Sequence, residues 1–219
     1  MRKISTLILA LVVCAGSLFA EDAITVGNFS YIFNSSKKTA EVNGTSLTSG
    51  KVEIPGSVEY NSVTYTVTSI GKRAFMYGDQ FTGFTFPNTL ETIGDQAFSG
   101  CTELTELDFP ASLKTIGKSA FQGDTKALKV TCRAIEPPVC GDYAFATYGS
   151  LYVPKGSIEK YADADGWSGF DPDIYAIDES AIDAVRSQSS AVSRKVVRDG
   201  VMYIERNGEL FNLTGARVK

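Results

Sequence analysis

Four aspartates lie close together in the segment DADGWSGFDPD, between residues 163 and 173, and their spacing raises the question of a metal site. Carboxylate oxygens suit Ca²⁺, but a calcium loop of the twelve-residue kind needs a third acidic ligand and a closing glutamate at fixed places. Both are missing here. We therefore predict no metal site and assign the aspartates to a solvated helix end and the turn after it. They are Asp163, Asp165, Asp171 and Asp173.

Cysteine is the other residue type here that could bind a metal or form a covalent bond. Beyond residue 20 the cysteines are Cys101, Cys132 and Cys140, and none forms the C-x-x-C pair that often holds zinc. An odd number leaves at least one thiol unpaired or paired between chains. We interpret these cysteines as buried small hydrophobes. A disulfide between Cys132 and Cys140 stays open as an alternative, since an exported protein permits it.

Histidine is absent from all 219 residues. This absence excludes Ser-His-Asp and Cys-His nucleophile systems, and it removes the commonest transition-metal ligand. The net charge is −4, and it becomes −6 without Arg2 and Lys3, because 19 basic residues then stand against 25 acidic ones. A protein that binds phosphate backbones needs a basic face, so the charge argues against a nucleic-acid partner.

The chain begins with MRKISTLILALVVCAGSLFAED, which has the composition of a secretory signal peptide. A basic tip precedes an apolar run from Ile4 to Val13 and small residues before Ala20, and the run is too short to span a membrane. We predict cleavage after Ala20 and a secreted or cell-surface location. Lipid attachment at Cys14 is an alternative, although the bulky Val13 stands where such signals prefer a small residue. We predict no membrane span elsewhere in the chain.

One short phrase, I-G-x-x-A-F, recurs at a fixed interval and indicates the architecture. It begins at Ile70, Ile93 and Ile116, so both steps are 23 residues. Whole copies of this length begin at Phe81 and Leu104, and a looser copy of 24 residues begins at Ala127. A period in the twenties with L-x-x-L-x-L spacing is typical of a leucine-rich-repeat solenoid, in which a single copy cannot bury its apolar edge alone.

Within a copy, the residues alternate as in a strand with one solvated face. Leu107 and Phe109 face inward, and Pro110 ends the strand because it cannot donate to a ladder. We expect the glycine of each phrase to permit a tight turn. Stacking then places the phenylalanines of successive copies in one interior column: Phe75, Phe98, Phe121 and Phe145.

The solenoid also bears on catalysis. Two carboxylates at a suitable separation hydrolyse glycosidic bonds in many enzymes, and the spacing of acids in this sequence does not exclude such a pair. A solenoid one coil thick, however, offers no obvious deep cleft for a substrate. We therefore predict that the protein is not an enzyme and needs no cofactor.

The pattern L-x-x-L-x-F-P-x-x-L-x-x-I-G-x-x-A-F resembles the BspA-like leucine-rich repeats of bacterial surface and secreted proteins. The resemblance covers residues 51–176 and includes the Pro, the I-G and the A-F at fixed offsets. It implies a mainly β, right-handed coil with one parallel sheet, an N-terminal β-hairpin cap and a short C-terminal capping helix. The better-known repeat has an asparagine after the strand, and here Asn88, Thr89 and Ser112 lie near that place without regular register.

These observations divide the chain into a signal peptide (1–20), an N-terminal β-hairpin cap (21–50), the leucine-rich-repeat solenoid (51–177), a polar linker (178–200) and a C-terminal hairpin or tail (201–219). The cap turns at residues 34–38, and the first coil carries a hairpin excursion within residues 55–70. We expect Ser157 to cap the closing helix and Trp167 to cover the last coil.

The outward residues of the sheet are the candidate site, because the resemblance implies that this face meets partners. One column comprises Glu53, Thr85, Asp108, Thr131 and Tyr152, and the next comprises Lys51, Gly83, Glu106, Lys129 and Ser150. Five strands at about 4.8 Å and some four residues at about 3.3 Å give about 300 Å². A standard protein interface takes about 800 Å² from each partner. Either the neighbouring loops are therefore part of the interface, or each contact is weak and binding gains strength from many copies of the protein on one surface.

We therefore predict an exported bacterial binding module that recognises a protein or a glycan without chemistry, as an adhesion protein does. A merely solvated sheet is the competing interpretation of the same face. The alternative function is a structural spacer or surface-assembly subunit with a C-terminal sorting tail.

The last residues bear on this alternative. The segment VMYIERNGELFNLTGARVK alternates around Asn207 and Gly208, which is a strong hairpin signal. The stretch Phe211–Gly215 resembles the ends of secreted proteins from bacteria that carry such repeats, some of which act as export or surface-sorting signals. A loosely attached hairpin without a sorting role is the other interpretation.

Overall fold

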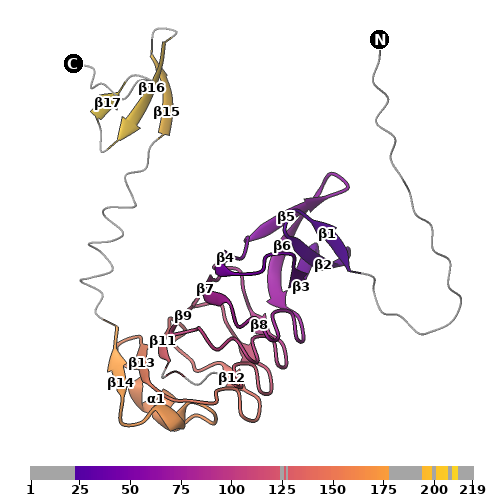
Figure 1. The fold of residues 1–219 in the computed structure, drawn as a ribbon. Coiled ribbons are helices and arrows are strands. Elements are labelled where there is room, and N and C mark those ends of the chain that lie inside the picture. The colour runs from indigo at the N-terminus through magenta and orange to yellow at the C-terminus, as the bar shows by residue number, and fades with distance from the viewer. Residues whose placement is uncertain are drawn as a thin grey trace, which may run out of the picture.

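The computed structural model describes residues 23–123, 126, 128–177, 194–198, 201–206 and 209–211. Up to residue 177 these residues form a β-solenoid of about 6 turns with parallel sheets and almost no helix. Figure 1 shows the coils stacked one on the next, from the N-terminal strands in indigo and purple to helix α1 in orange. The leucine-rich-repeat coil predicted from the 23-residue period is confirmed.

A three-stranded antiparallel unit caps the N-terminal end of the solenoid: β1 (Ile24–Val26), β2 (Phe29–Asn34) and β3 (Thr39–Thr45). The turn between β2 and β3 lies where the sequence predicts it, and the Asn34 side chain accepts the Lys37 amide at 2.9 Å. Strand β3 then pairs in parallel with β6 (Val63–Ile70). The cap therefore continues into a ladder of the solenoid and covers the open edge of its first coil.

Short parallel strands form a ladder along the side of the coils that carries the I-G phrase: β6, β8 (Thr92–Ile93), β10 (Thr115–Ile116) and β12 (Val139–Cys140). Strand β5 (Ser57–Tyr60) forms the predicted hairpin excursion with β6, through a turn at Asn61 and Ser62 that have positive φ. The sequence predicts one parallel sheet, and this ladder adds a second. Strands of two residues are too short to show a period of their own.

The sheet that carries the candidate site is divided in two. Strand β4 (Gly50–Glu53) pairs in parallel with β7 (Phe81–Thr85). The second group is parallel throughout and comprises β9 (Glu106–Phe109), β11 (Lys129–Cys132), β13 (Ser150–Val153) and β14 (Ile174–Ala176). Among the described residues no strand pairing joins β7 to β9. The sheet face is therefore interrupted between these two strands.

Stacked phenylalanines form the centre of the core. The ring centroids of Phe75 and Phe98 are 5.2 Å apart, and those of Phe98 and Phe121 are 5.1 Å apart. The ring of Phe145 continues the stack at 5.5 Å from Phe121, and all three pairs are within 7° of parallel. All four side chains are buried. The interior column expected from the repeat is present, and each ring buries on the order of 150–250 Å².

The glycine of each I-G phrase is required by the neighbouring coil and not by its own turn. A Cβ on Gly117 would lie 2.4 Å from the backbone nitrogen of Asp95, and one on Gly141 would lie 2.5 Å from that of Lys118. Neither glycine has a positive φ. The left-handed backbone occurs two residues later in each copy, at Arg73, Gln96, Ser119 and Tyr143. The prediction of a turn glycine is therefore corrected: the glycine admits the backbone of the preceding coil.

Hydroxyl groups take over the place of the missing asparagine. Thr89 Oγ1 donates to the carbonyl of Val67 at 2.7 Å, and Ser112 Oγ donates to the carbonyl of Leu90 at 2.6 Å. Each bond reaches one coil back along the chain. Backbone carbonyls of the preceding coil are thereby satisfied inside the stack, as buried polar groups require.

Two short helices close the C-terminal end of the solenoid: α1 (Ile158–Ala162) and the 3-10 helix η1 (Ser168–Phe170). Ser157 occupies the N-cap position of α1, but its side chain does not cap the helix and donates to the carbonyl of Ile135 at 2.9 Å. The prediction is corrected in this respect, because the hydroxyl serves the preceding coil. Trp167 is fully buried 5.3 Å from the ring of Phe145, and its Nε1 donates to the carbonyl of Pro138 at 2.8 Å. It covers the last coil as expected.

Three further strands form an antiparallel sheet of their own: β15 (Arg194–Arg198), β16 (Val201–Arg206) and β17 (Glu209–Phe211). Strand β15 lies inside the range 178–200 that the sequence assigns to a linker. The predicted signal peptide, Cys14 and the tail residues after Phe211 lie outside the described residues. The division of the chain into five parts stays a prediction.

Candidate functional site

Outward side chains of neighbouring strands lie in register on the sheet face. From β9 to β14 one column is Asp108, Thr131, Tyr152 and Tyr175, and the other, from β9 to β13, is Glu106, Lys129 and Ser150. On β4 and β7, Lys51 pairs with Gly83 and Glu53 pairs with Thr85. The structure thus brings the predicted residues together within each half of the face and separates the halves between β7 and β9. Their role in binding stays a prediction.

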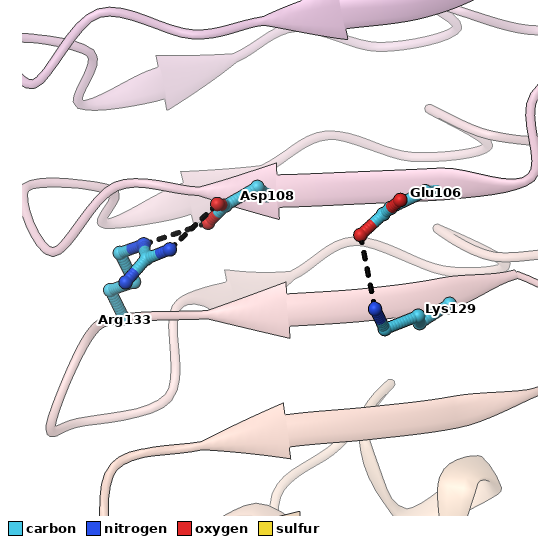
Figure 2. Close-up of polar contacts among 4 residues, drawn as sticks. All are labelled: Glu106, Asp108, Lys129 and Arg133. Atoms are coloured by element: carbon cyan, nitrogen blue, oxygen red, sulfur yellow. Dashed lines mark hydrogen bonds and ion pairs between the residues drawn. The ribbon is translucent and has the colours of Figure 1, made fainter. Parts of the chain in front are cut away.

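Arg133 holds Asp108 across two adjacent coils (Figure 2). Its Nε donates to Oδ1 at 2.8 Å and its Nη2 donates to Oδ2 at 2.7 Å. Such two-pronged, charge-assisted pairs fix geometry better than a single hydrogen bond does. Hydrogen bonding to Asp108 raises the pKa of Arg133, although burial opposes the effect. The pair therefore presents a charged donor and a charged acceptor side by side at one end of the strands.

Sequence reasoning missed Arg133, although the sequence carries a signal for it. In the other copies a proline follows the last inward residue of the strand segment: Pro55, Pro87, Pro110 and Pro154. The copy that contains β11 has Arg133 at this place. The repeat's own pattern therefore marks the position, because a proline ring offers no polar contact and a guanidinium offers five donors.

Lys129 connects an ion pair to a pair of tyrosines. Its Nζ lies 3.2 Å from Glu106 Oε1, as Figure 2 shows, and 5.5 Å from the centroid of the Tyr152 ring. The Tyr152 ring lies 5.5 Å from that of Tyr175, whose hydroxyl donates to Asp173 at 3.0 Å. This hydrogen bond raises the pKa of Tyr175. The repeat pattern does not point to Tyr175, because this residue lies beyond its last copy.

Two hollows open beside this row of side chains, and both include Arg133. The first, of about 430 Å³, lies between β7 and β9, and its lining includes Lys51, Gly83, Glu106 and Asp108. The second, of about 530 Å³, lies past the strand ends, between residues 111–114 and 133–138. The candidate site therefore extends from the sheet face around Arg133 onto the neighbouring loops.

A family model described as the BspA type leucine rich repeat region matches residues 56–156 in 6 copies. Residues 56–156 of the solenoid are a BspA-type leucine-rich repeat region. A leucine-rich repeat protein from Bacteroides ovatus shares 28% identity at a TM-score of 0.47, over 59% of this chain and 40% of that protein. One from Bacteroides capillosus shares 22% at a TM-score of 0.44, over 70% and 97%.

A leucine-rich cell surface protein from Faecalibacterium prausnitzii shares 16% identity at a TM-score of 0.40, over 90% of this chain and 62% of that protein. The chain therefore spans 40% of the length of the Bacteroides ovatus protein. No curated protein matches it.

Two carboxylates on the sheet face are held in ion pairs. Asp108 is bound by Arg133, and Glu106 by Lys129. Within the ranges that the structure describes, no group of three or more His, Cys, Asp or Glu residues is placed to hold a metal ion. None of the helices in those ranges has the length and apolarity needed to cross a membrane. The arrangement is suited to hydrogen bonding and ring contacts with a partner.

Cys132 and Cys140 are not joined by a disulfide and are free thiols. Cys132 is in register with Phe109 and Cys140 with Ile116, as the repeat predicts. Burial, with a further contribution from Cys132, raises the pKa of Cys140 to about 12. Burial also raises the pKa of Cys132, whose sulfur accepts the Tyr161 hydroxyl at 3.2 Å. Reactive thiolates are therefore disfavoured, and the interpretation as buried hydrophobes fits this environment.

Proposed function

We propose that this protein is an exported bacterial binding module that recognises a protein or a glycan without chemistry. The partner contacts the sheet face of the BspA-type coils and the loops next to it. The observation that carries the proposal is the exposed row of charged and aromatic groups in register across β9, β11, β13 and β14. Its ion pairs leave the carboxylates half-exposed, with side-chain exposures of 51% at Asp108 and 62% at Glu106.

The two hollows extend the surface that is available to a partner beyond the small sheet face. The sheet face alone offers about 300 Å² by strand spacing, well below the share of a standard protein interface. Because Arg133 lines both hollows, a partner that contacts this residue reaches the face and the strand-end loops together. The side chain of Ile135, which is exposed and belongs to the lining of the second hollow, enlarges the surface further. Loops and flanks therefore belong to the proposed site.

Affinity capture from envelope and extracellular-matrix extracts tests this proposal. The full chain is compared with an Asp108→Arg/Tyr152→Ala variant, which changes the face. The matched control, Lys118→Ala/Asp142→Ala, removes an exposed ion pair from the I-G side of the coils. We expect the full chain and the control to recover the same partner and the face variant to recover background. Equal recovery by all three chains would show that the face is not used.

A second function, a spacer or surface-assembly subunit with a sorting tail, is favoured by the separate antiparallel sheet of β15, β16 and β17. Deletion of residues 201–219 removes two of these strands, and a matched deletion of residues 178–193 retains all three. Cell fractionation then shows where each chain goes. A sorting role predicts that only the deletion of residues 201–219 changes the location of the protein. If that deletion leaves the location unchanged, the tail has no sorting role.

A further inference from the structure

The hollow between β7 and β9 exists because one side chain is missing from the face. In the column Lys51, Gly83 and Glu106 the middle residue is glycine, between two long side chains. A Cβ on Gly83 would meet only the Lys51 side chain, at 3.8 Å, which is an ordinary contact. Gly83 does not have a positive φ. Neither close approach nor backbone conformation requires a glycine here, in contrast to Gly117.

The floor of this hollow is apolar and its rim is polar. Phe84 and Phe86 belong to its lining, and 5% and 8% of these two residues are exposed. Around them lie hydroxyl, amide and charged groups: Lys51, Thr82, Thr85, Asn88, Thr105, Glu106, Asp108 and Arg133. A ligand that fits must combine an apolar face with a hydrogen-bonding edge.

The lining holds two basic and two acidic side chains, and Glu106 also pairs with Lys129 beside it. Lys51 and Arg133 are basic, whereas Glu106 and Asp108 are acidic. Arg133 and Asp108 are already paired by two hydrogen bonds, so neither presents an uncompensated charge. An anionic ligand would lie against the carboxylates, and a cationic ligand would lie against the guanidinium. The rim therefore favours an uncharged ligand with many hydroxyl groups.

The volume of the hollow favours a glycan over a protein as the partner. A volume of about 430 Å³ lies within the range of about 300–1,000 Å³ that is usual for small-ligand pockets. The face around it is too small for a standard protein interface. A sugar ring has an apolar C–H face that packs on aromatic edges and hydroxyl groups that reach the rim. The planar Asp108–Arg133 pair offers such hydroxyls an acceptor and a donor side by side.

We infer that the Gly83 hollow is the subsite for one uncharged sugar residue of a glycan. This inference rests on the proposed function, since the hollow lies in the proposed binding face, and it names the glycan as the partner. The sugar ring packs against Phe84 and Phe86 and hydrogen-bonds to the Asp108–Arg133 pair. No bond is made or broken.

A Gly83→Tyr variant of the full chain tests the inference, because its side chain fills the hollow without a backbone clash. The matched control is Thr92→Tyr, which adds the same side chain at an exposed position of β8, on the I-G side of the coils and outside the lining of the hollow. The probe is an array of neutral glucans, mannans, galactans and xylans beside sialylated and sulfated glycans. We expect neutral glycans to bind the full chain and the control, and to bind Gly83→Tyr at least about tenfold more weakly. Thermal melting confirms that both variants fold.

Three outcomes separate this inference from the proposed function. If no neutral glycan binds, or if Gly83→Tyr binds as well as the control, the sugar subsite is overturned. If extract capture survives periodate oxidation of glycans and is lost after protease treatment, the partner is a protein and the binding module stands without this subsite. If the face variant Asp108→Arg/Tyr152→Ala captures as much from extracts as the full chain does, the proposed function itself fails.

Discussion

The guanidinium of Arg133 binds the carboxylate of Asp108 from the preceding coil, through hydrogen bonds of 2.8 and 2.7 Å. The two residues are 25 positions apart, and Arg133 occupies a place that is proline in the other copies. Both side chains remain partly exposed, at 38% and 51%. A solvent-exposed pair contributes little to stability, so we interpret this pair as part of the recognition surface.

Removal of both partners, as Asp108→Ala/Arg133→Ala, is expected to change the free energy of unfolding by less than about 1 kcal/mol. Urea unfolding of the double variant and of each single variant measures this change and the coupling between the residues. The same double variant is expected to lose most of the capture described above. A loss of several kcal/mol in stability would instead identify the pair as a structural element of the coil stack.

Phe121→Ala is expected to destabilise the protein by about 3–5 kcal/mol, because it removes a buried ring and leaves a cavity in the column. Phe121 lies between Phe98 and Phe145, so both neighbours lose a stacking partner. The control is Tyr77→Ala, which removes an aromatic side chain that is 74% exposed. Equilibrium denaturation of both variants measures the difference. Equal, small effects would contradict the interior column.

Two glycine substitutions are expected to change the free energy of unfolding in opposite directions. Gly117→Ala places a Cβ against the backbone of the preceding coil and should cost about 1–3 kcal/mol or more. Gly83→Ala meets no such contact and should stabilise by about 0.4–1 kcal/mol, since alanine restricts the unfolded chain. Denaturation midpoints of the two variants, measured side by side, provide the test. A destabilised Gly83→Ala variant would mean that the hollow has a structural cause.

Stability is expected to fall at alkaline pH. Burial raises the pKa of Cys140 from an ordinary 9.0 to about 12, so the folded state retains a proton that the unfolded state releases. The contribution of the thiol is complete below pH 9 and is lost as the pH rises toward 12. Chemical denaturation between these values measures the slope. Cys140→Ala should reduce the slope, and an unchanged slope would show that other groups, such as the buried Tyr161 whose pKa is also raised, account for it.

The repeat period predicts the coil stack well, because each copy must place the same side chains in the same environment. It places Phe98 above Phe121 and Cys132 beside Phe109, and the structure agrees at both positions. The alternation of Glu106 and Asp108 with inward residues also predicts which side chains face outward. These are local patterns that a single copy already contains.

Other features depend on distances between coils, which no local pattern contains. The role of Gly117 follows from a backbone 2.4 Å from its missing Cβ, and one copy read alone suggests a turn. The bond of Ser157 to Ile135 replaces the expected helix cap for the same reason. The interruption of the sheet is a third such feature: β7 and β9 do not pair among the described residues, although their copies have equal length and similar sequences.

The central claim is that the sheet face, and not the I-G side of the coils, contacts the partner. Hydrogen–deuterium exchange of the full chain, measured free and on beads that carry the captured glycan or protein, tests it most directly. We predict slower exchange on binding in β9, β11 and β13 and in the loop after Arg133, and no change in residues 115–123. Slower exchange confined to residues 115–123, with the sheet strands unchanged, would contradict the claim.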